Sequence, residues 1–207
     1  LGLTGGIASG KSTVSELLKK QGIPIVDADI LAHRAVEKGS SGLQSVVQAF
    51  GRDILSLDGS LDRKKLGLRV FKSKTDLEKL ESILHPIVRK LAEQEREKLK
   101  KMGHRMAIYD VPLLYEKKME NLFDEVIVVH ASLAQQKQRL KARNHLNDQE
   151  IQQRIRSQIS LEDKIKKIKL IILQNANGNQ YNYLQVDIPA HRNSIAIEPM
   201  TCLTNAF

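Results

Sequence analysis

The sequence predicts an α/β fold in which a parallel sheet is covered by helices on both faces. Short apolar runs alternate with segments of helical spacing, and runs that are apolar throughout are typical of strands buried on both faces. A glycine-rich stretch follows the first run directly, as it does where a parallel sheet binds a ligand at the carboxyl ends of its strands. The runs are LGLTG at 1–5, IPIVDAD at 23–29, MAIYDVPLL at 106–114, EVIVVHA at 125–131 and LIIL at 170–173.

The glycine-rich stretch LTGGIASGKST matches the phosphate-binding pattern G-x-x-x-x-G-K-[ST] through Gly5, Gly10, Lys11 and Ser12. Glycines bring backbone N–H groups close to an anion, the lysine adds a mobile positive charge, and the serine hydroxyl can hold Mg²⁺. A glycine-rich turn without chemistry is the alternative, but the strand before it and the helical spacing after it favour phosphate binding. We expect ATP to be bound by Gly6, Ala8, Ser9, Gly10, Lys11, Ser12 and Thr13.

Composition limits the classes of partner. The 207 residues are 41% hydrophobic, which suits one α/β domain with small insertions, and no apolar run is long enough to span a bilayer. Cys202 is the only cysteine, which favours a reducing, cytoplasmic setting. No cleavable signal is visible, although Leu1 leaves room for a few residues before it.

The net charge of +9 fits nucleic acid or polyanionic small molecules. Basic residues are dispersed and aromatic residues make up only 4%, so no stacking platform for bases is evident. We therefore expect nucleotide phosphates as ligands, and neither a nucleic acid nor a membrane as partner.

Two helical insertions are expected. Residues 61–102 carry an apolar stripe, and Pro86 predicts a break between two helices near His85. A second insertion covers 133–165, where NDQE at 147–150 predicts a helix start. The stripe consists of Leu77, Leu80, Leu84, Val88 and Leu91, and the expected helix start pairs Asn147 as cap with Glu150.

Three carboxylates follow or end predicted strands, and we expect them at the same edge of the sheet as the phosphate loop. The side chains of Asp27 and Asp29 point the same way if their stretch is extended. One could then accept the proton from an attacking hydroxyl, while the other orients that hydroxyl or holds metal-bound water. The alternative for Asp29 is a helix cap, since a helical segment follows. Asp110 has a Walker-B-like position for a metal, or is a plain strand-end residue.

Basic side chains of the second insertion are candidates for a mobile flap that closes over the transferring phosphate. Arg139 and Arg143 lie four residues apart and so share a helix face, and Arg154 and Arg156 follow in the next helix. A solvated basic face is the alternative for each arginine. His85, which precedes a proline, is more typical of a packed or capping histidine than of a ligand.

Together, GLTGGIASGKST, VDADILAH, LHPIV, DVPLLYE and QRLKAR…IQQRIRSQ resemble the dephospho-coenzyme A kinases, over residues 1 to about 166. The resemblance implies ATP- and Mg²⁺-dependent phosphorylation of the ribose 3′-hydroxyl of dephospho-coenzyme A. It implies Asp29 as general base, with Asp27 beside it at the metal and phosphates, and Ser12 and Asp110 as metal ligands.

The resemblance also implies roles for the insertions. Residues 61–102 look like the substrate-binding domain, with His85 and Arg89. Residues 133–158 carry the lid motifs, and the insertion 133–165 as a whole is expected to be the lid. The catalytic positions implied are Asp29, Asp27, Lys11, Arg139 and Arg143. The substrate-binding positions implied are Asp29, His85, Arg89, Pro112, Leu113, Leu114, Glu116 and Arg154.

The composition changes near residue 170. Beyond it the chain has one basic residue, Arg192, and two acidic ones, Asp187 and Glu198. The final 27 residues, beginning YNYLQV, resemble the carboxyl-terminal strands of aldose 1-epimerases of the galactose mutarotase type. We therefore expect a kinase-like domain over 1–174 and a divergent tail over 175–207, from a fusion, a truncation or a composite of two genes.

The fold class expected is a P-loop, nucleotide-kinase-like α/β fold with a parallel five-stranded sheet and helical substrate-binding and lid insertions. Alternative functions are another small-molecule P-loop kinase, such as a nucleoside monophosphate kinase, a basic nucleic-acid-binding module, or an inactive remnant. The oligomeric state is not predicted.

Overall fold

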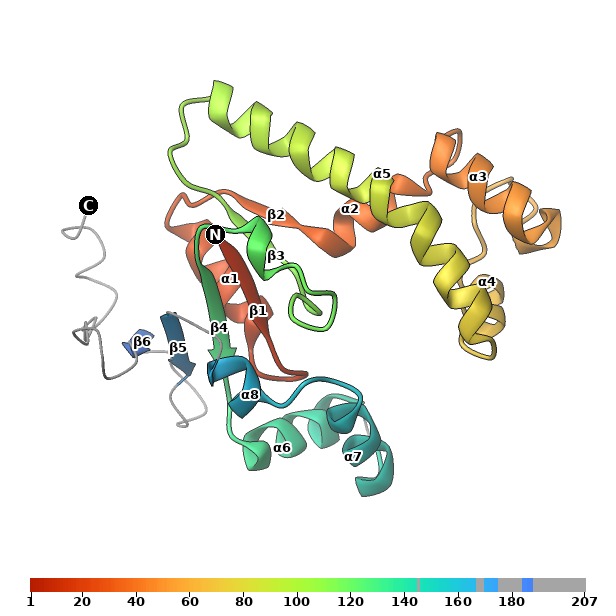
Figure 1. Cartoon of the computed structure of the whole chain (residues 1–207). Helices are drawn as coiled ribbons and strands as arrows, with labels where there is room; N and C mark the ends of the chain where they lie inside the picture. The colour runs from red at the N-terminus through yellow and green to blue at the C-terminus, as the bar shows by residue number, and fades with distance from the viewer. Residues whose placement is uncertain (145, 167–169, 175–183, 188–207) are drawn as a thin grey trace. The chain divides into compact units, whose positions relative to one another are not determined.

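The computed structural model describes residues 1–144, 146–166, 170–174 and 184–187. The chain divides into two compact units. The sheet unit combines Leu1–Ile25 with the chain from Met106 onward, and the helical unit is Val26–Arg105 (Figure 1).

The sheet unit is built on parallel strands in which Leu3 of the first strand faces Asp110 on one side and Ile127 on the other. Ile127 in turn pairs with Leu170. Val126–Val129 are buried throughout, as expected of a strand in the middle of a covered sheet. The strand order is β2-β3-β1-β4-β5-β6. The strands are β1 (Gly2–Gly5), β2 (Ile25–Asp27), β3 (Ile108–Asp110), β4 (Val126–His130), β5 (Leu170–Gln174) and β6 (Leu184–Asp187).

The predicted α/β parallel sheet is confirmed, but the expected five parallel strands are not. In the described part of the chain, a defined parallel register joins four strands, β3, β1, β4 and β5. The run 23–29 yields only the three residues of β2, because the Asp27 side chain already caps the next helix. At the other edge, β6 pairs antiparallel with β5.

The tail is described only at β6, whose residues lie in the segment that begins YNYLQV and resembles the strands of an epimerase. The other residues that resemble an epimerase lie outside the described residues. The division of the chain after residue 174 therefore stays a prediction.

Two helices of the sheet unit, α6 and α7, begin where short polar side chains cap them. The predicted helix start at NDQE is confirmed, because Asn147 and Glu150 form a reciprocal capping box. Ser132 and Gln135 exchange equivalent hydrogen bonds at the preceding helix. The helices are α1 (Lys11–Lys20), α6 (Leu133–Asn144), α7 (Asp148–Arg156) and α8 (Leu161–Lys166), with a 3₁₀ turn η2 (Glu120–Leu122).

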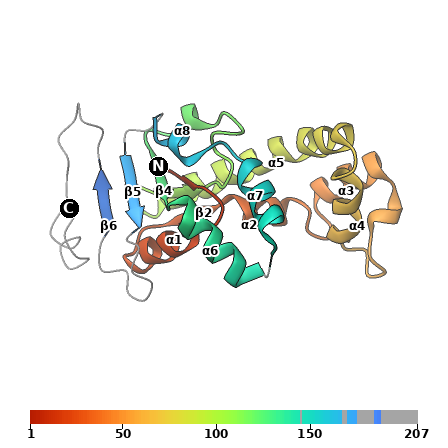
Figure 2. The same ribbon diagram turned by 90° about the horizontal axis from the view of Figure 1, so that it is seen from below.

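The helical unit packs shorter helices against one long helix, α5, as both views show (Figures 1 and 2). Val46, Phe50 and Ile54 are almost fully buried at its core, and Leu77 and Leu80 of α5 pack on them. None of the described helices combines the length and hydrophobicity needed to cross a membrane. Its elements are α2 (Ala28–Ala35), α3 (Ser41–Phe50), η1 (Arg52–Ile54), α4 (Arg63–Val70) and α5 (Lys74–Lys101).

The expected break near His85 is wrong, because α5 continues through Pro86. Proline removes one N–H donor, which would otherwise bond the Ser82 carbonyl, and this costs a helix stability. Packing on both sides of the proline offsets that cost: Leu84 joins the core before it, and Ile87 lies against Gly42 of α3 after it. The local sequence pattern predicted a break, but tertiary contacts keep the helix continuous.

Pro86→Ala should therefore stabilise the helical unit. The substitution restores a donor for the Ser82 carbonyl at an exposed position, and we expect a gain of about 1–3 kcal/mol after the greater freedom of the unfolded chain is counted. Urea unfolding followed by circular dichroism measures it. An unchanged or lower midpoint would show that Pro86 fits the helix without cost.

Candidate active site

The phosphate loop joins β1 to α1 in a conformation suited to an anion. Ala8 and Gly10 both have left-handed backbone angles, with φ of 57° and 98°. Such residues turn successive N–H groups toward one side of the loop. Gly10 is also the N-cap of α1 and supplies no side-chain cap; its carbonyl accepts the N–H groups of Thr13 and Val14, at 3.0 and 3.1 Å. The N-terminus of a helix attracts negative charge, and a phosphate fits this end.

Close packing explains the first two glycines of the loop. A Cβ added to Gly5 would lie 2.5 Å from Ser9 Oγ and 2.9 Å from the Val129 carbonyl oxygen. A Cβ on Gly6 would lie 3.0 Å from Leu161 Cγ. The loop therefore turns back on itself and lies directly against α8, with no room for side chains at these positions.

Lys11 and Asp110 meet at the carboxyl end of the sheet. Lys11 Nζ forms an ion pair with one oxygen of Asp110, and Ser15 Oγ donates to the other at 2.5 Å. Asp110 is only 3% exposed, at the end of β3 where the sequence placed it. Ser15 was not predicted, although it follows Lys11 by one helical turn and so shares its face.

Mg²⁺ suits the donors that the sequence singled out. Ser12 is exposed at the start of α1, next to Lys11, and Asp110 carries the carboxylate that Lys11 and Ser15 bind. Mg²⁺ is commonly held by one or two such oxygens together with nucleotide phosphates. Within the described residues, no group of three or more His, Cys, Asp or Glu side chains forms a metal site of its own.

Side chains from the predicted lid hold the outer side of the loop. Arg139 Nη1 donates to the carbonyls of Ala8 and Ser9, at 3.2 and 3.1 Å. The N–H of Ile7 donates to Gln158 Oε1 at 2.8 Å. Gln158 was not predicted as a site residue, although it ends the motif IQQRIRSQ, because nothing local indicates that its side chain reaches the loop.

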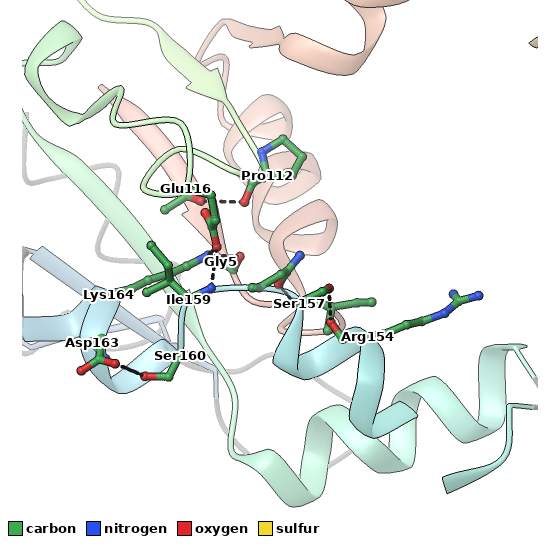
Figure 3. A network of polar contacts seen from close by, with 12 residues as sticks. Gly5, Pro112, Glu116, Arg154, Ser157, Ile159, Ser160, Asp163 and Lys164 are labelled. Atoms are coloured by element: carbon green, nitrogen blue, oxygen red, sulfur yellow. Dashed lines mark hydrogen bonds and ion pairs between the residues drawn. The ribbon is translucent and has the colours of Figure 1, made fainter. Parts of the chain in front are cut away.

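A fully buried lysine, Lys164 of α8, also reaches the loop and was not predicted. Its Nζ lies 3.4 Å from the Gly5 carbonyl oxygen and 2.8 Å from Glu116 Oε1. The same Glu116 oxygen accepts the N–H of Ile159 at 3.0 Å, as Figure 3 shows. Glu116 is thus bound to the lid helices within the sheet unit.

Most of the segment 112–116 is held in the interior of the sheet unit. Thr4 Oγ1 donates to the Pro112 carbonyl at 3.1 Å, and Leu114 is fully buried. Leu113 is 37% exposed and is the member of the segment most open to a ligand. Burial, and to a smaller degree the Glu120 carboxylate, raises the pKa of the Tyr115 phenol to about 12. Tyr115 is therefore protonated at any ordinary assay pH.

Two further arginines of the predicted lid are exposed. Arg143 and Arg154 are exposed on α6 and α7. Figure 3 shows the Arg154 guanidinium pointing away from Glu116 and Lys164. Their contact with substrate stays a prediction.

The other predicted site residues belong to the helical unit. Asp27, and not Asp29, is the cap of α2: Asp27 Oδ1 accepts the N–H groups of Asp29 and Ile30 at 2.8 and 3.1 Å. Asp29 lies exposed in the first turn. His85 and Arg89 are exposed one turn apart on α5. The roles of these residues in catalysis and substrate binding stay predictions.

Comparison with known proteins identifies the family of this chain. A family model described as dephospho-CoA kinase matches residues 1–180. The chain belongs to the dephospho-CoA kinase family. The match continues to residue 180, beyond the limit of about 166 expected from sequence motifs.

Individual relatives agree over most of the chain. A dephospho-CoA kinase of Bdellovibrio bacteriovorus is 47% identical over 90% of this chain and 92% of its own length. One of Listeria innocua is 45% identical over 84% and 88%. Among solved structures, a Campylobacter jejuni dephospho-CoA kinase has a TM-score of 0.63 at 30% identity, covering 87% of this chain and 88% of its own. A Thermus thermophilus protein, TT1252, reaches 0.72 at 34%, covering 85% and 88%.

Gly5→Ala tests the loop geometry. The new methyl group would push on Ser9 and on the Val129 carbonyl, so we expect affinity for ATP to fall by about tenfold or more. Gly67→Ala is the matched control, because a Cβ there meets nothing closer than 3.6 Å within α4. Equal ATP affinity of both variants, by calorimetric titration, would contradict the proposed role of the loop.

Proposed function

We propose that this chain transfers the γ-phosphoryl group of ATP to the ribose 3′-hydroxyl of dephospho-CoA, giving CoA and ADP. The observation that carries the proposal is a phosphate loop with Lys11 at the start of α1, in a chain that is 47% identical to a dephospho-CoA kinase. We also infer a cytoplasmic setting, in which ATP is abundant and a lone cysteine stays reduced.

Lys11 and the loop supply most of the charge stabilisation. Phosphoryl transfer depends on positioning and on neutralising the phosphate oxygens more than on covalent chemistry. Lys11 exchanges its contact with Asp110 for the β- and γ-phosphate oxygens when ATP binds. Ser12 and Asp110 would hold Mg²⁺, which would supply further neutralisation of phosphate charge. Arg139, Arg143 and Arg154 then add positive charge from the lid.

Asp29 acts as the general base in this proposal. Its exposed carboxylate takes the proton of the 3′-hydroxyl while that oxygen forms the new bond to the γ-phosphorus and the bond to ADP breaks. Asp27 caps α2 through Oδ1, and its other oxygen, Oδ2, would help to hold the metal and the phosphates.

The acceptor is expected to bind along the exposed side chains of the predicted substrate-binding elements. Arg89 and His85 offer a cation and a hydrogen-bonding ring one turn apart, which suits the diphosphate of dephospho-CoA. Leu113 offers an apolar surface in the segment 112–116. An alternative acceptor is a nucleoside monophosphate, which also presents a ribose and a phosphate.

Acceptor-dependent release of ADP tests the proposal. The purified full chain, ATP and Mg²⁺ are incubated with dephospho-CoA, with AMP or with neither, and ADP is measured by a coupled assay. We expect release to depend on dephospho-CoA. Faster release with AMP would favour a nucleoside monophosphate kinase, and ATP binding without turnover would favour an inactive remnant.

Lys11→Ala should lower kcat by at least about a hundredfold, because it removes charge stabilisation at the transferring group. Lys20→Ala, at the exposed end of the same helix, is the matched control. Thermal unfolding of both variants shows whether the loss of the partner of Asp110 also affects folding. Near-normal kcat in a folded Lys11→Ala protein would contradict the assignment of this loop as the binding site for the ATP phosphates.

Asp29→Asn should abolish turnover while ATP affinity stays within a few-fold, since asparagine keeps the size but not the basicity of aspartate. Asp62→Asn, at the cap of α4 in the same unit, controls for general effects of losing an acidic side chain at a helix start. If Asp29→Asn instead loses ATP binding and thermal stability together with turnover, its role is structural.

A further inference from the structure

Lys164 is the one residue with a charged side chain among the largest fully buried residues of the described chain. Burying an ammonium group is costly unless close partners compensate, and an apolar residue of similar volume often stabilises a fold as well or better. The position of this lysine therefore calls for a reason beyond packing.

Lys164 has partners in two separate parts of the sheet unit, and one of them, Glu116, is bound in turn by a third part (Figure 3). Lys164 Nζ contacts the Gly5 carbonyl oxygen at 3.4 Å and Glu116 Oε1 at 2.8 Å. Glu116 Oε1 accepts the N–H of Ile159 as well, whereas Oε2 is buried without a hydrogen-bond partner in the described structure. The cluster thus connects the first residue of the loop pattern, the segment 112–116 and the lid.

We propose that Lys164 is a positioning residue for phosphoryl transfer: it fixes the first peptide of the phosphate loop and, through Glu116, couples that peptide to the segment 112–116 and the lid. The kinetic part of this inference rests on the proposed function. The part that concerns nucleotide binding requires only that the loop binds ATP.

Peptide geometry gives the mechanism. In a trans peptide the carbonyl and the following N–H point in opposite directions. An ammonium group held at the Gly5 carbonyl therefore directs the Gly6 N–H away from Lys164 and polarises the peptide, which makes that N–H a better donor to an anion. Gly6 has no side chain to fix this plane, so an external contact must do so.

The main test is Lys164→Met, which keeps length and removes the charge. Lys166→Met is the matched control, because Lys166 lies on the same helix, is exposed, and pairs only locally with Asp163 at 3.1 Å. Affinity for ATP is measured by calorimetry without acceptor, and kcat, KM for ATP and Tm follow. We expect Lys164→Met to weaken ATP binding by about tenfold, and Lys166→Met to leave it unchanged.

A second variant keeps the test decisive if Lys164→Met does not fold. Glu116→Gln retains an oxygen for Lys164 and Ile159 but removes the negative charge, and we expect KM for ATP to rise several-fold. A purely structural role would lower Tm and leave the affinity and KM of the folded protein unchanged. Unchanged ATP affinity in Glu116→Gln, and in Lys164→Met where it folds, would overturn the proposal.

The two proposals fail in different ways. If dephospho-CoA is the wrong acceptor, the wild-type chain shows no turnover with it, but the effects on ATP binding remain. If the positioning role is wrong, wild-type turnover is present and the variants bind ATP normally.

Discussion

A phosphate loop must present its N–H groups to an anion, and this constraint decides how the backbone around it is held. Each peptide that turns its N–H toward the ligand turns its carbonyl the other way. Buried carbonyls need donors, or the loop loses stability. Here the donors are cations: Lys164 contacts Gly5, and Arg139 contacts Ala8 and Ser9. Both come from helices more than 120 residues further along the chain.

The same constraint links the site to the sheet. Gly5 ends β1 opposite Val129 of β4, so the start of the loop is held by strand pairing, and α1 leaves from its far end. Lys11 and Ser15 of α1 both bind Asp110, the last residue of β3. Two neighbouring strands and one helix therefore fix the loop at both ends, and the predicted lid fixes its middle. A rigid frame of this kind suits a reaction that depends on alignment.

The parts of the site with a local sequence signal were predictable. The loop pattern, Asp110 at a strand end and the capping box at Asn147 each depend on residues within a few positions of one another. Features that depend on contacts between residues far apart in the sequence could not be predicted. Pro86 was expected to break a helix that packing on α2, α3 and α4 keeps continuous. The cap of α2 is Asp27, because β2 ends earlier than its apolar run suggested.

Lys164 and Gln158 show why the rest of the site could not be predicted. Each is a single polar residue in or beside a short helix, in a stretch where charged residues are common. Only the path of the chain brings them to Gly5 and Ile7, at sequence separations of 159 and 151 residues. The burial of a lysine is visible only once the helices are placed on the sheet.

The most direct measurement is the identity of the product. The full chain is incubated with ATP, Mg²⁺ and dephospho-CoA, and the purified product is examined by proton and phosphorus NMR. We expect a new phosphate monoester whose phosphorus couples to the hydrogen on the ribose 3′-carbon, together with an equal amount of ADP. A phosphate attached elsewhere, or ADP and free phosphate without a phosphorylated acceptor, would contradict this expectation.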